Sequence, residues 1–442
     1  MNVARVESIL NLNKQNTQFY KSYCYILNML PEVPDWIVYV LIFGGFLMSF
    51  YFFLVLFTAQ EKPKLKKLGK TAFIIPAKNV EHTLERCVKS VVDQNYGDFI
   101  YIIIVNDAST DRTLEIAKKL KRKFDSQTRK IIILTRKHST GKKASAINHG
   151  LKYVLSNLKV QYIAVLDADT FIEKQALRDN MAYLQKPGIM GSTSWLVPYN
   201  KGNFWEKMQK VEYVLTGFYR VLLGRVSAIC VAPAFTVFRA EFFKKAGFYD
   251  EHTLTEDFEI ALRLRSLGYD MAFTDNKVLT IVPSRFKDLR RQRIRWWHGT
   301  LQNIAKYRHL ISIKQGALGT FFLPVALILG TLFLVTALFI IGYDILFKLT
   351  NFVHDLLLGV MPKLKFEINL FSLSLALSDP KVILVVFGFL FSLIFLVYAR
   401  KTINEKINIL EYCLFILCYG WILAIFCIEA GIKYLFRRHV KW

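Results

Sequence analysis

The chain has 442 residues, of which 53% are hydrophobic and 14% aromatic, and its 59 Lys and Arg against 34 Asp and Glu give a formal net charge of +25. This apolar content excludes an intrinsically disordered chain, which lacks the residues to form a core. One soluble domain is disfavoured, because a single core stops growing beyond roughly 250–300 residues. Long apolar runs beside basic segments are typical of a membrane protein, whereas a nucleic-acid-binding protein would not need those runs.

The first apolar run covers residues 36–57, which contain no charged residue. A helix needs about 20 apolar residues to cross a bilayer core of about 30 Å. We therefore expect residues 36–57 to span the membrane, and an interfacial position is one option for the preceding residues 1–35. Lysines follow the run directly, at Lys62, Lys64, Lys66, Lys67 and Lys70. Positive residues favour the cytoplasmic side, so the chain that follows is expected in the cytoplasm.

Residues 71–285 have the composition of a soluble α/β domain. Short apolar segments predict strands at Phe73–Pro76, Tyr101–Val105, Lys130–Leu134 and Tyr162–Leu166. The stretches around them predict helices at Glu81–Gln94, Asp111–Phe124 and Lys143–Leu158. Strands that alternate with helical crossovers indicate a mostly parallel sheet, and such sheets bind ligands at the carboxyl ends of their strands.

The last part of the chain, residues 317–442, returns to apolar runs after a basic stretch, 286–316, in which we expect interfacial helices. The runs predict about three spans, at Gly319–Leu346, Val382–Tyr398 and Ile409–Ile428. Residues 352–379 are amphipathic and are expected to lie in the interface. This arrangement places the basic C-terminus outside, against the positive-inside rule. Either the number of spans is off by one or the rule fails in this chain.

Acidic residues follow two of the predicted strands. Asp107 comes after the strand Tyr101–Val105, where a turn, with Asp111 as the cap of the next helix, explains the cluster as well as a contact to a base or ribose does. Asp167 and Asp169 follow the strand Tyr162–Leu166, and on an extended chain they share a face. Two such carboxylates repel, and Mg²⁺ or Mn²⁺ would relieve the repulsion. A solvated Asx turn is the alternative.

Two further segments begin predicted helices. Residues 140–148 superficially resemble a P-loop, but the upstream glycine is missing and Lys143 stands where Ser or Thr is needed, so we reject a Walker site. Lysines at a helix start still suit an anionic group. In the second segment, Thr255 as a helix cap followed by Glu256 and Asp257 is the structural explanation. A carboxylate at this place is otherwise a candidate general base.

The stretch Arg290–His298 predicts a basic helix, for which anionic lipid is the simplest partner. Gln292 and Arg295 lie three residues apart and therefore share a helix face. Trp296 adds a flat apolar surface that suits stacking against a sugar ring.

The order and spacing of these clusters resemble the family 2 membrane glycosyltransferases, which include cellulose, hyaluronan and poly-N-acetylglucosamine synthases. The motifs are Asp107, Asp167-x-Asp169, Thr255-Glu256-Asp257 and Gln292-x-x-Arg295-Trp296, and the resemblance covers residues 71–300. It implies a GT-A (nucleotide-diphospho-sugar transferase) domain flanked by transmembrane and interfacial helices. By this resemblance the donor nucleotide is bound by Pro76, Ala77, Asp107, Lys143, Asp167 and Arg295. It also makes Asp169 the ligand of Mg²⁺ or Mn²⁺, Asp257 the catalytic base, and Glu256, Gln292 and Trp296 acceptor-binding residues.

The reaction that the resemblance implies is a single displacement with inversion at the sugar. Two functions stay open: a processive synthase that makes and exports a β-linked polysaccharide, and a single-sugar transferase to a lipid, similar to ceramide glucosyltransferases. Ala234 stands where polymerases often have a Gly-containing loop, which leaves the acceptor open. We expect a UDP-sugar donor, a polysaccharide or lipid acceptor, membrane lipids as partners and no nucleic acid. A homo-oligomer or an accessory subunit is a further option, in a multi-pass plasma-membrane protein with its catalytic domain in the cytoplasm.

Overall fold

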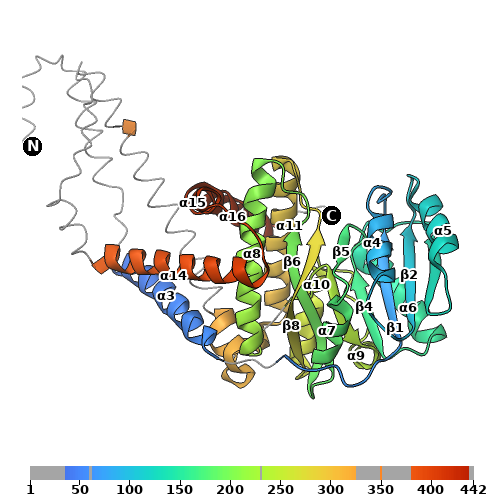
Figure 1. Cartoon of the computed structure of the whole chain (residues 1–442). Helices are drawn as coiled ribbons and strands as arrows, with labels where there is room; N and C mark the ends of the chain where they lie inside the picture. Colours follow the sequence, from blue (N-terminus) through green and yellow to red (C-terminus); the bar gives the residue numbers. More distant parts are fainter. Residues whose placement is uncertain (1–34, 59–61, 229–230, 325–348, 351–379, 438–442) are drawn as a thin grey trace, which may run out of the picture. The chain divides into compact units, whose positions relative to one another are not determined.

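The computed structural model describes residues 35–58, 62–228, 231–324, 349–350 and 380–437 (Figure 1). Its contacts divide the chain into two units. One unit comprises Met1–Met48 and Leu327–Gly388, and the other comprises Ser49–Ala326 and Phe389–Trp442. The second unit contains the whole α/β domain and every site residue predicted from the sequence.

A mixed sheet of eight strands forms the centre of this unit, in the order β3-β2-β1-β4-β7-β6-β8-β5. The strands are β1 (Thr71–Ala77), β2 (Ile100–Asp107), β3 (Arg129–Arg136), β4 (Tyr162–Leu166), β5 (Thr170–Ile172), β6 (Ile189–Pro198), β7 (Phe235–Arg239) and β8 (Asp270–Thr280). The four strands predicted from the sequence are β1 to β4, and they pair in parallel. Strand β7 runs antiparallel to both of its neighbours, and β5 runs antiparallel to β8, so the sheet is mixed.

Helices cover both faces of the sheet. They are α4 (Leu84–Val92), α5 (Thr113–Phe124), α6 (Lys143–Asn157), α7 (Ala176–Leu184), α8 (Phe204–Arg225), α9 (Ala240–Ala246), α10 (Glu256–Ser266) and α11 (Phe286–Lys306). The three predicted helices are α4 to α6, and α4 and α5 begin two or three residues later than expected. Asp111 explains the later start of α5, because its carboxylate accepts hydrogen bonds from the Thr113 and Glu81 amides instead of forming part of the helix.

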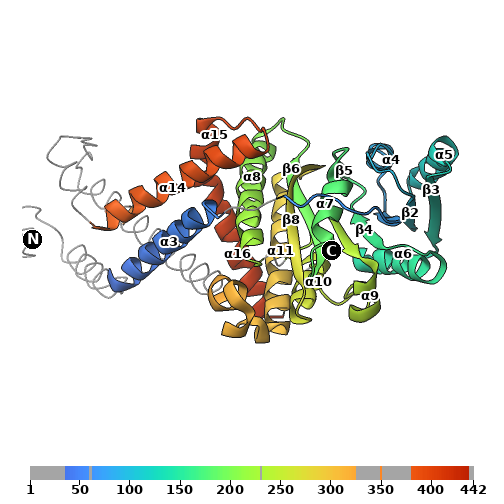
Figure 2. The same cartoon turned by 60° about the horizontal axis from the view of Figure 1, so that its bottom comes forward.

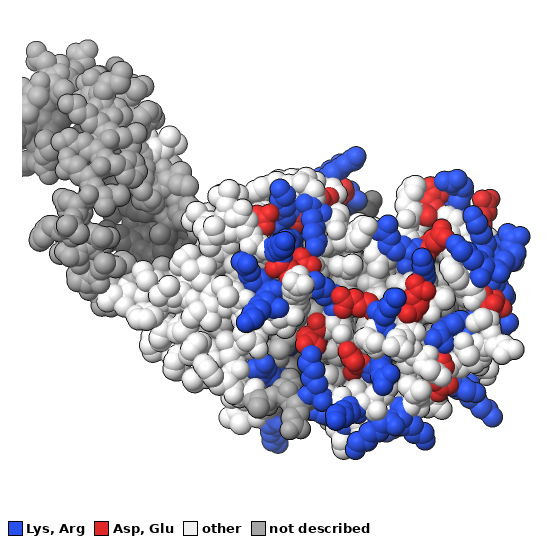
Figure 3. Space-filling model, viewed as in Figure 1, with Lys and Arg blue, Asp and Glu red and all other residues white. Residues whose placement is uncertain are grey.

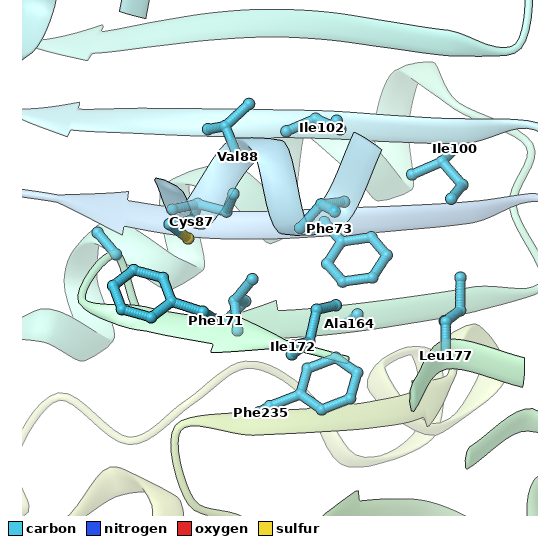
Figure 4. Packing of buried hydrophobic residues seen from close by; sticks show 14 of the residues in the cluster. Phe73, Cys87, Val88, Ile100, Ile102, Ala164, Phe171, Ile172, Leu177 and Phe235 are labelled. Carbon is cyan, nitrogen blue, oxygen red and sulfur yellow. The ribbon is translucent and has the colours of Figure 1, made fainter. Parts of the chain in front are cut away.

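Alternation along β1 fixes the two faces. Phe73 points into an apolar cluster that contains Cys87 and Val88 of α4 and Phe235 of β7 (Figure 4). Ile74 points the other way, toward α6. A Cβ added to Gly150 of α6 would lie 2.7 Å from the Ile74 side chain, so only glycine allows α6 to pack this closely. Helix α6, whose first residue is Lys143, is therefore held tightly against the sheet (Figure 2).

At the other end of the sheet, α8 and α11 are covered by a C-terminal apolar helix. This helix covers Ile409–Leu435 and consists of α15 (Ile409–Leu414), a π-helical turn at Phe415–Tyr419 and α16 (Gly420–Leu435). Figure 2 shows α8, α11 and α16 side by side. Leu289 and Ile294 of α11 are buried in one apolar cluster with Phe426 and Ala430 of α16.

The predicted spans have mixed outcomes. Residues 36–57 form helix α3 (Asp35–Leu56), and the second C-terminal run lies in α14 (Pro380–Thr402). Among the described residues, Ile409–Leu435 alone is long and apolar enough to cross a membrane, and Ile42–Leu56 is a shorter apolar helix. Residues 352–379 and most of the run 319–346 lie outside the described residues. One candidate span is therefore present, and the larger number stays a prediction.

Candidate active site

The topology of the sheet creates a crevice beside β1. The chain builds β1, β2 and β3 outward in one direction and then returns to place β4 on the other side of β1. Because all four strands are parallel, their carboxyl ends meet at one edge, and the reversal of order leaves an opening between β1 and β4. A cavity of about 250 Å³ lies there, and Pro76, Ala77, Asp107, Lys143, Asp167 and Asp169 are among its lining residues. The nucleotide-binding residues predicted on strand ends thus lie together.

The turn after β4 brings Asp167 and Asp169 into the crevice. The predicted extended conformation is wrong here, because the Thr170 amide donates to the Asp167 carbonyl and closes a turn. Both carboxylates nevertheless line the same cavity. Burial, and after it the charge of Asp167, raises the pKa of Asp169 to about 6. A positive charge nearby would therefore favour the ionised form of the Asp169 carboxylate.

Lys143 connects the two halves of the site. Its ammonium lies 2.5 Å from a carboxylate oxygen of Asp167 and 3.4 Å from one of Glu256. Burial lowers the pKa of Lys143, but the surrounding carboxylates outweigh this effect and the net pKa is raised. The lysine is thus a fixed positive charge between the turn after β4 and the start of α10.

Asp107 is held at the end of β2 by residues that the sequence did not single out. Its carboxylate accepts hydrogen bonds from Arg136 at 2.6 Å and from Ser139 at 2.5 Å, and its side chain is almost fully buried. Arg136 also donates to Ser145 of α6. This network fixes one wall of the nucleotide-sized cavity and links β3 to α6.

A second cavity, of about 360 Å³, shares Lys143, Asp167 and Asp169 with the first. Its other walls come from the start of α10, from α8 and from α11. Its lining includes Glu256, Asp257, Gln292 and Trp296, so the predicted base and acceptor residues lie together. Arg295, which was predicted to bind the nucleotide, lies with them and does not line the first cavity. The two cavities adjoin each other at Asp167 and Asp169, which line both.

The beginning of α10 differs from the predicted helix cap. Thr255 occupies the capping position, but its side chain does not cap the helix. Its hydroxyl instead accepts a hydrogen bond from Asn303 of α11, whose amide also bonds the Thr255 carbonyl. The acidic first turn is thereby attached to α11. Burial raises the pKa values of Glu256 and Asp257, and the charge of Lys143 opposes this rise.

A short strip, residues 231–234, is hydrogen-bonded through the backbone to both Asp167 and Asp257. The Asp167 amide donates to the Ala234 carbonyl at 2.9 Å, and the Ala232 amide donates to the Asp257 carbonyl at 3.0 Å. Val231, Pro233 and Ala234 line the second cavity. Ala234, which the sequence marks as a difference from many polymerases, is therefore part of the cavity wall beside the candidate base Asp257.

Helix α8 supplies site residues that sequence reasoning missed. Glu212, Thr216 and Arg220 lie four residues apart and, with Tyr213, line the second cavity. Polar side chains at this spacing occupy one helix face, and within an otherwise apolar stretch this periodicity was the available signal. The start of α8 is fixed by a capping box between Asn203 and Glu206.

Arg293 is the second missed residue, and it is 2% exposed. Its guanidinium stacks on the Trp296 ring at 4.3 Å and donates to Gln292 at 2.5 Å. It also pairs with Glu212 of α8 at 2.7 Å, and Glu212 accepts a further bond from Tyr419 of the C-terminal apolar helix. The predicted acceptor residues Gln292 and Trp296 are thus held in place by the arginine between them.

The residues of the junction fit a divalent cation of the kind that binds with substrate phosphates. Magnesium sites of this type use one or two protein carboxylates and take further ligands from phosphates and water. Asp167 and Asp169 provide that pair at the point where the cavities meet. The described residues contain no cluster of three or more His, Cys, Asp or Glu suited to a metal.

Comparisons with known proteins agree with this site. The family described as "Glycosyl transferase family 2" matches residues 72–247, and "Glycosyl transferase family group 2" matches residues 162–427, more than half of the chain. The chain is a family 2 glycosyltransferase. The family match extends past the α/β domain through α11 and most of the C-terminal apolar helix.

This glycosyltransferase is similar in sequence to known synthases and in fold to a solved structure. It is 28% identical to the poly-beta-1,6-N-acetyl-D-glucosamine synthase of Staphylococcus aureus (strain COL) over 57% of this chain and 60% of the relative. It is 26% identical to the Staphylococcus epidermidis synthase of the same name over 62% and 65%. The match thus spans less than two thirds of either relative. The mannosyltransferase PcManGT from Pyrobaculum calidifontis, solved with GDP-Man and Mn²⁺, covers 91% of this chain and 98% of its own at a TM-score of 0.60 and 15% identity. This likeness confirms the GT-A fold.

We expect the Arg293→Met variant of this glycosyltransferase to lose sugar transfer by about tenfold or more, since about 1.4 kcal/mol of lost positioning has that effect. Nucleotide binding should stay close to that of the wild type, because Arg293 contacts Gln292 and Trp296 and does not line the first cavity. Transfer rates and nucleotide calorimetry on the detergent-purified protein measure the two effects.

Arg291→Met is the matched control, because Arg291 is an exposed arginine on the same helix. Tyr419→Phe removes only one bond to Glu212, and it should cause a smaller loss in the same direction. A thermal-unfolding midpoint for each variant separates lost positioning from lost folding. Equal activity losses in the Arg291 and Arg293 variants would contradict the positioning role.

Proposed function

We propose that this protein is a membrane-embedded, inverting glycosyltransferase that transfers a sugar from a UDP-sugar to a growing β-linked polysaccharide and exports the product. The observation that supports this most directly is the pair of joined cavities. One is of nucleotide size at the strand ends, and the other is lined by acidic residues and Trp296. Their junction at Lys143, Asp167 and Asp169 is where a sugar diphosphate would bridge them.

The donor is proposed to lie along the first cavity. Asp107, braced by Arg136, and the backbone of Pro76 and Ala77 would hold the uridine. Lys143 begins α6, where free amide groups and the lysine charge favour a phosphate. Arg295 of α11, which lines the second cavity, would reach the diphosphate at the junction.

The transfer step follows from the placement of Asp257. Its carboxylate takes the proton of an acceptor hydroxyl, and the hydroxyl oxygen attacks the anomeric carbon as the bond from that carbon to the UDP oxygen breaks. The bonding electrons leave with UDP, and the configuration at the carbon inverts. Burial raises the pKa of Asp257, which makes it a stronger proton acceptor than an exposed aspartate. Arg295 and Lys143 offset the charge that develops on the departing diphosphate.

A divalent cation, Mg²⁺ or Mn²⁺, is proposed as the cofactor, with Asp169 as its protein ligand. When bound, it would neutralise charge on the leaving diphosphate. Asp167, paired with Lys143, would hold the turn that carries Asp169 in place and would orient the lysine toward the phosphates.

Synthesis of a polymer is supported by the name shared by both relatives, poly-beta-1,6-N-acetyl-D-glucosamine synthase. The alternative is transfer of one sugar to a lipid. The apolar helix Ile409–Leu435 favours it, because this helix packs on α11 directly behind the acceptor residues. An acyl chain would have apolar surface close to the site.

Placement in the plasma membrane, with the catalytic domain in the cytoplasm, is also proposed. Large apolar side chains are exposed along α3 and α14, among them Phe43, Leu47, Ile383, Val386 and Leu390. Figure 3 shows charged side chains gathered over the α/β domain and an uncharged surface over the middle of α14. The end of α3 is fixed to the domain by Arg225, which donates to the Val55 and Leu56 carbonyls.

Product size distinguishes the two functions. Membranes that contain the protein are incubated with radiolabelled UDP-sugars and Mg²⁺ or Mn²⁺, and the product is separated by gel filtration and by solvent extraction. We expect labelled material of high molecular weight. Label that enters the organic phase as one sugar per lipid would establish the alternative instead, and absence of turnover with every donor would overturn both.

Asp257→Asn should abolish transfer and leave UDP affinity nearly unchanged, because the amide cannot accept the hydroxyl proton but keeps the shape of the side chain. Removal of a general base lowers rates by about 10²- to 10⁴-fold. Asp93→Asn is the matched control, since Asp93 is an exposed aspartate at the end of α4. Transfer at the wild-type rate in the Asp257 variant would show that another group is the base.

Asp169→Asn tests the cofactor. Wild-type protein treated with a chelator should bind UDP weakly and recover its affinity on addition of Mn²⁺. The variant should show the weak affinity throughout, because it lacks the protein ligand of the cation. Calorimetric titration of UDP with and without Mn²⁺ gives both affinities. A variant that still gains affinity from Mn²⁺ as the wild type does would exclude Asp169 as the ligand.

A further inference from the structure

The chain just before the C-terminal apolar helix is bound to the catalytic domain. Glu405 is nearly buried and pairs with Lys201 at 2.9 Å and with Lys277 of β8 at 3.2 Å. Lys210 of α8 donates to the carbonyl of Lys406. These contacts come from three separate parts of the domain. The start of the helix, at Ile409, is therefore on the side of the membrane where the domain lies.

The end of the same helix is bound to the domain as well. Glu429 forms two bonds with Arg290 of α11, at 2.9 and 2.6 Å, and pairs with Lys433. Near the last turn, the ring of Tyr434 packs edge-on against His298, with 5.5 Å between ring centroids. Ala430 between them is fully buried. The end of the helix is thus fixed along α11.

The length of the helix makes these two attachments decisive. A helix of 27 residues is about 40 Å long. If it crossed a bilayer core of about 30 Å, one end would be separated from the domain by that thickness. Both ends instead contact the domain, and Tyr419 in the middle bonds Glu212 of α8. The helix that passes the length and composition test for a span therefore lies along the domain.

The opposite side of this helix is apolar and exposed. Its large exposed side chains include Leu410, Leu417, Ile425 and Ile432, at spacings of seven or eight residues, which is one helix face. Lipid is the partner that fits this face, because α3 and α14, with their own exposed apolar side chains, end at the same domain. The basic residues Arg437, Arg438 and Lys441 follow in the sequence and suit anionic headgroups.

We propose that residues 409–435 form an interfacial helix that lies flat on the cytoplasmic membrane surface, with one face on α8 and α11 and the other in the lipid. The C-terminus is then on the same side as the catalytic domain. This inference rests on the proposed membrane placement. It removes one span from the number predicted from the sequence, and it resolves the conflict between that number and the positive-inside rule.

Accessibility of two tags in the full-length protein tests the proposal. One epitope tag follows Trp442, and a reference tag is inserted at Gln127, in the exposed turn between α5 and β3. Each protein is probed with protease in intact spheroplasts and in inverted membrane vesicles. We expect both tags to be protected in spheroplasts and cleaved in inverted vesicles.

The two tags separate the two ideas. A C-terminal tag cleaved in spheroplasts while the Gln127 tag stays protected would overturn the interfacial helix and leave the membrane placement intact. If both tags are cleaved in spheroplasts, the proposed cytoplasmic placement of the catalytic domain is wrong. Sugar transfer by each tagged protein, measured in the same membranes, shows that the tags have not unfolded the chain.

Discussion

The site depends on the ion pairs that the ammonium group of Lys143 forms. This group lies at the first residue of α6 and pairs with carboxylates from two other elements, the turn after β4 and the start of α10. Without it, the acidic side chains at this junction would repel one another, and burial already makes the charged forms of Asp169, Glu256 and Asp257 costly. The close packing of α6 on the sheet at Gly150 fixes where that charge lies. The packing of α6 on the sheet therefore sets the position of the positive charge that balances the carboxylates of the site.

A second constraint comes from the layer of helices α8, α11 and Ile409–Leu435. Arg293 is buried against Trp296, and its charge is balanced by Glu212, which also bonds Tyr419. Burying such a charge is costly unless every partner is in place. The proposed acceptor residues are therefore connected to the surface that we propose lies against lipid. Gln292 and Trp296 share one hydrogen-bond network with the helix Ile409–Leu435.

The α/β part was predictable from the sequence because its signals are local, whereas the roles of the site residues were predicted from the family resemblance. The strands β1 to β4 are short apolar runs, Asp107 ends β2 and Asp167 follows β4, and parallel strands bring these positions to one edge. The antiparallel β7 was not predictable, since it lacks a crossover pattern. The periodicity of α8 was visible, but tertiary packing decides that Glu212 reaches the site. Thr255 fits a capping position by sequence, but Asn303 of α11 competes for its hydroxyl. The position of Ile409–Leu435 depends on ion pairs with Lys201, Lys277 and Arg290, which hydropathy does not register.

The strip of residues 231–234 has a consequence for how such enzymes diverge. It is bonded to Asp167 and to Asp257 through main-chain groups, while Val231 and Ala234 line the second cavity. Exchanging those side chains alters the shape of the cavity without breaking the bonds that hold the two aspartates in register. The wall of this cavity can therefore be reshaped by substitution while the separation of Asp167 and Asp257 stays the same.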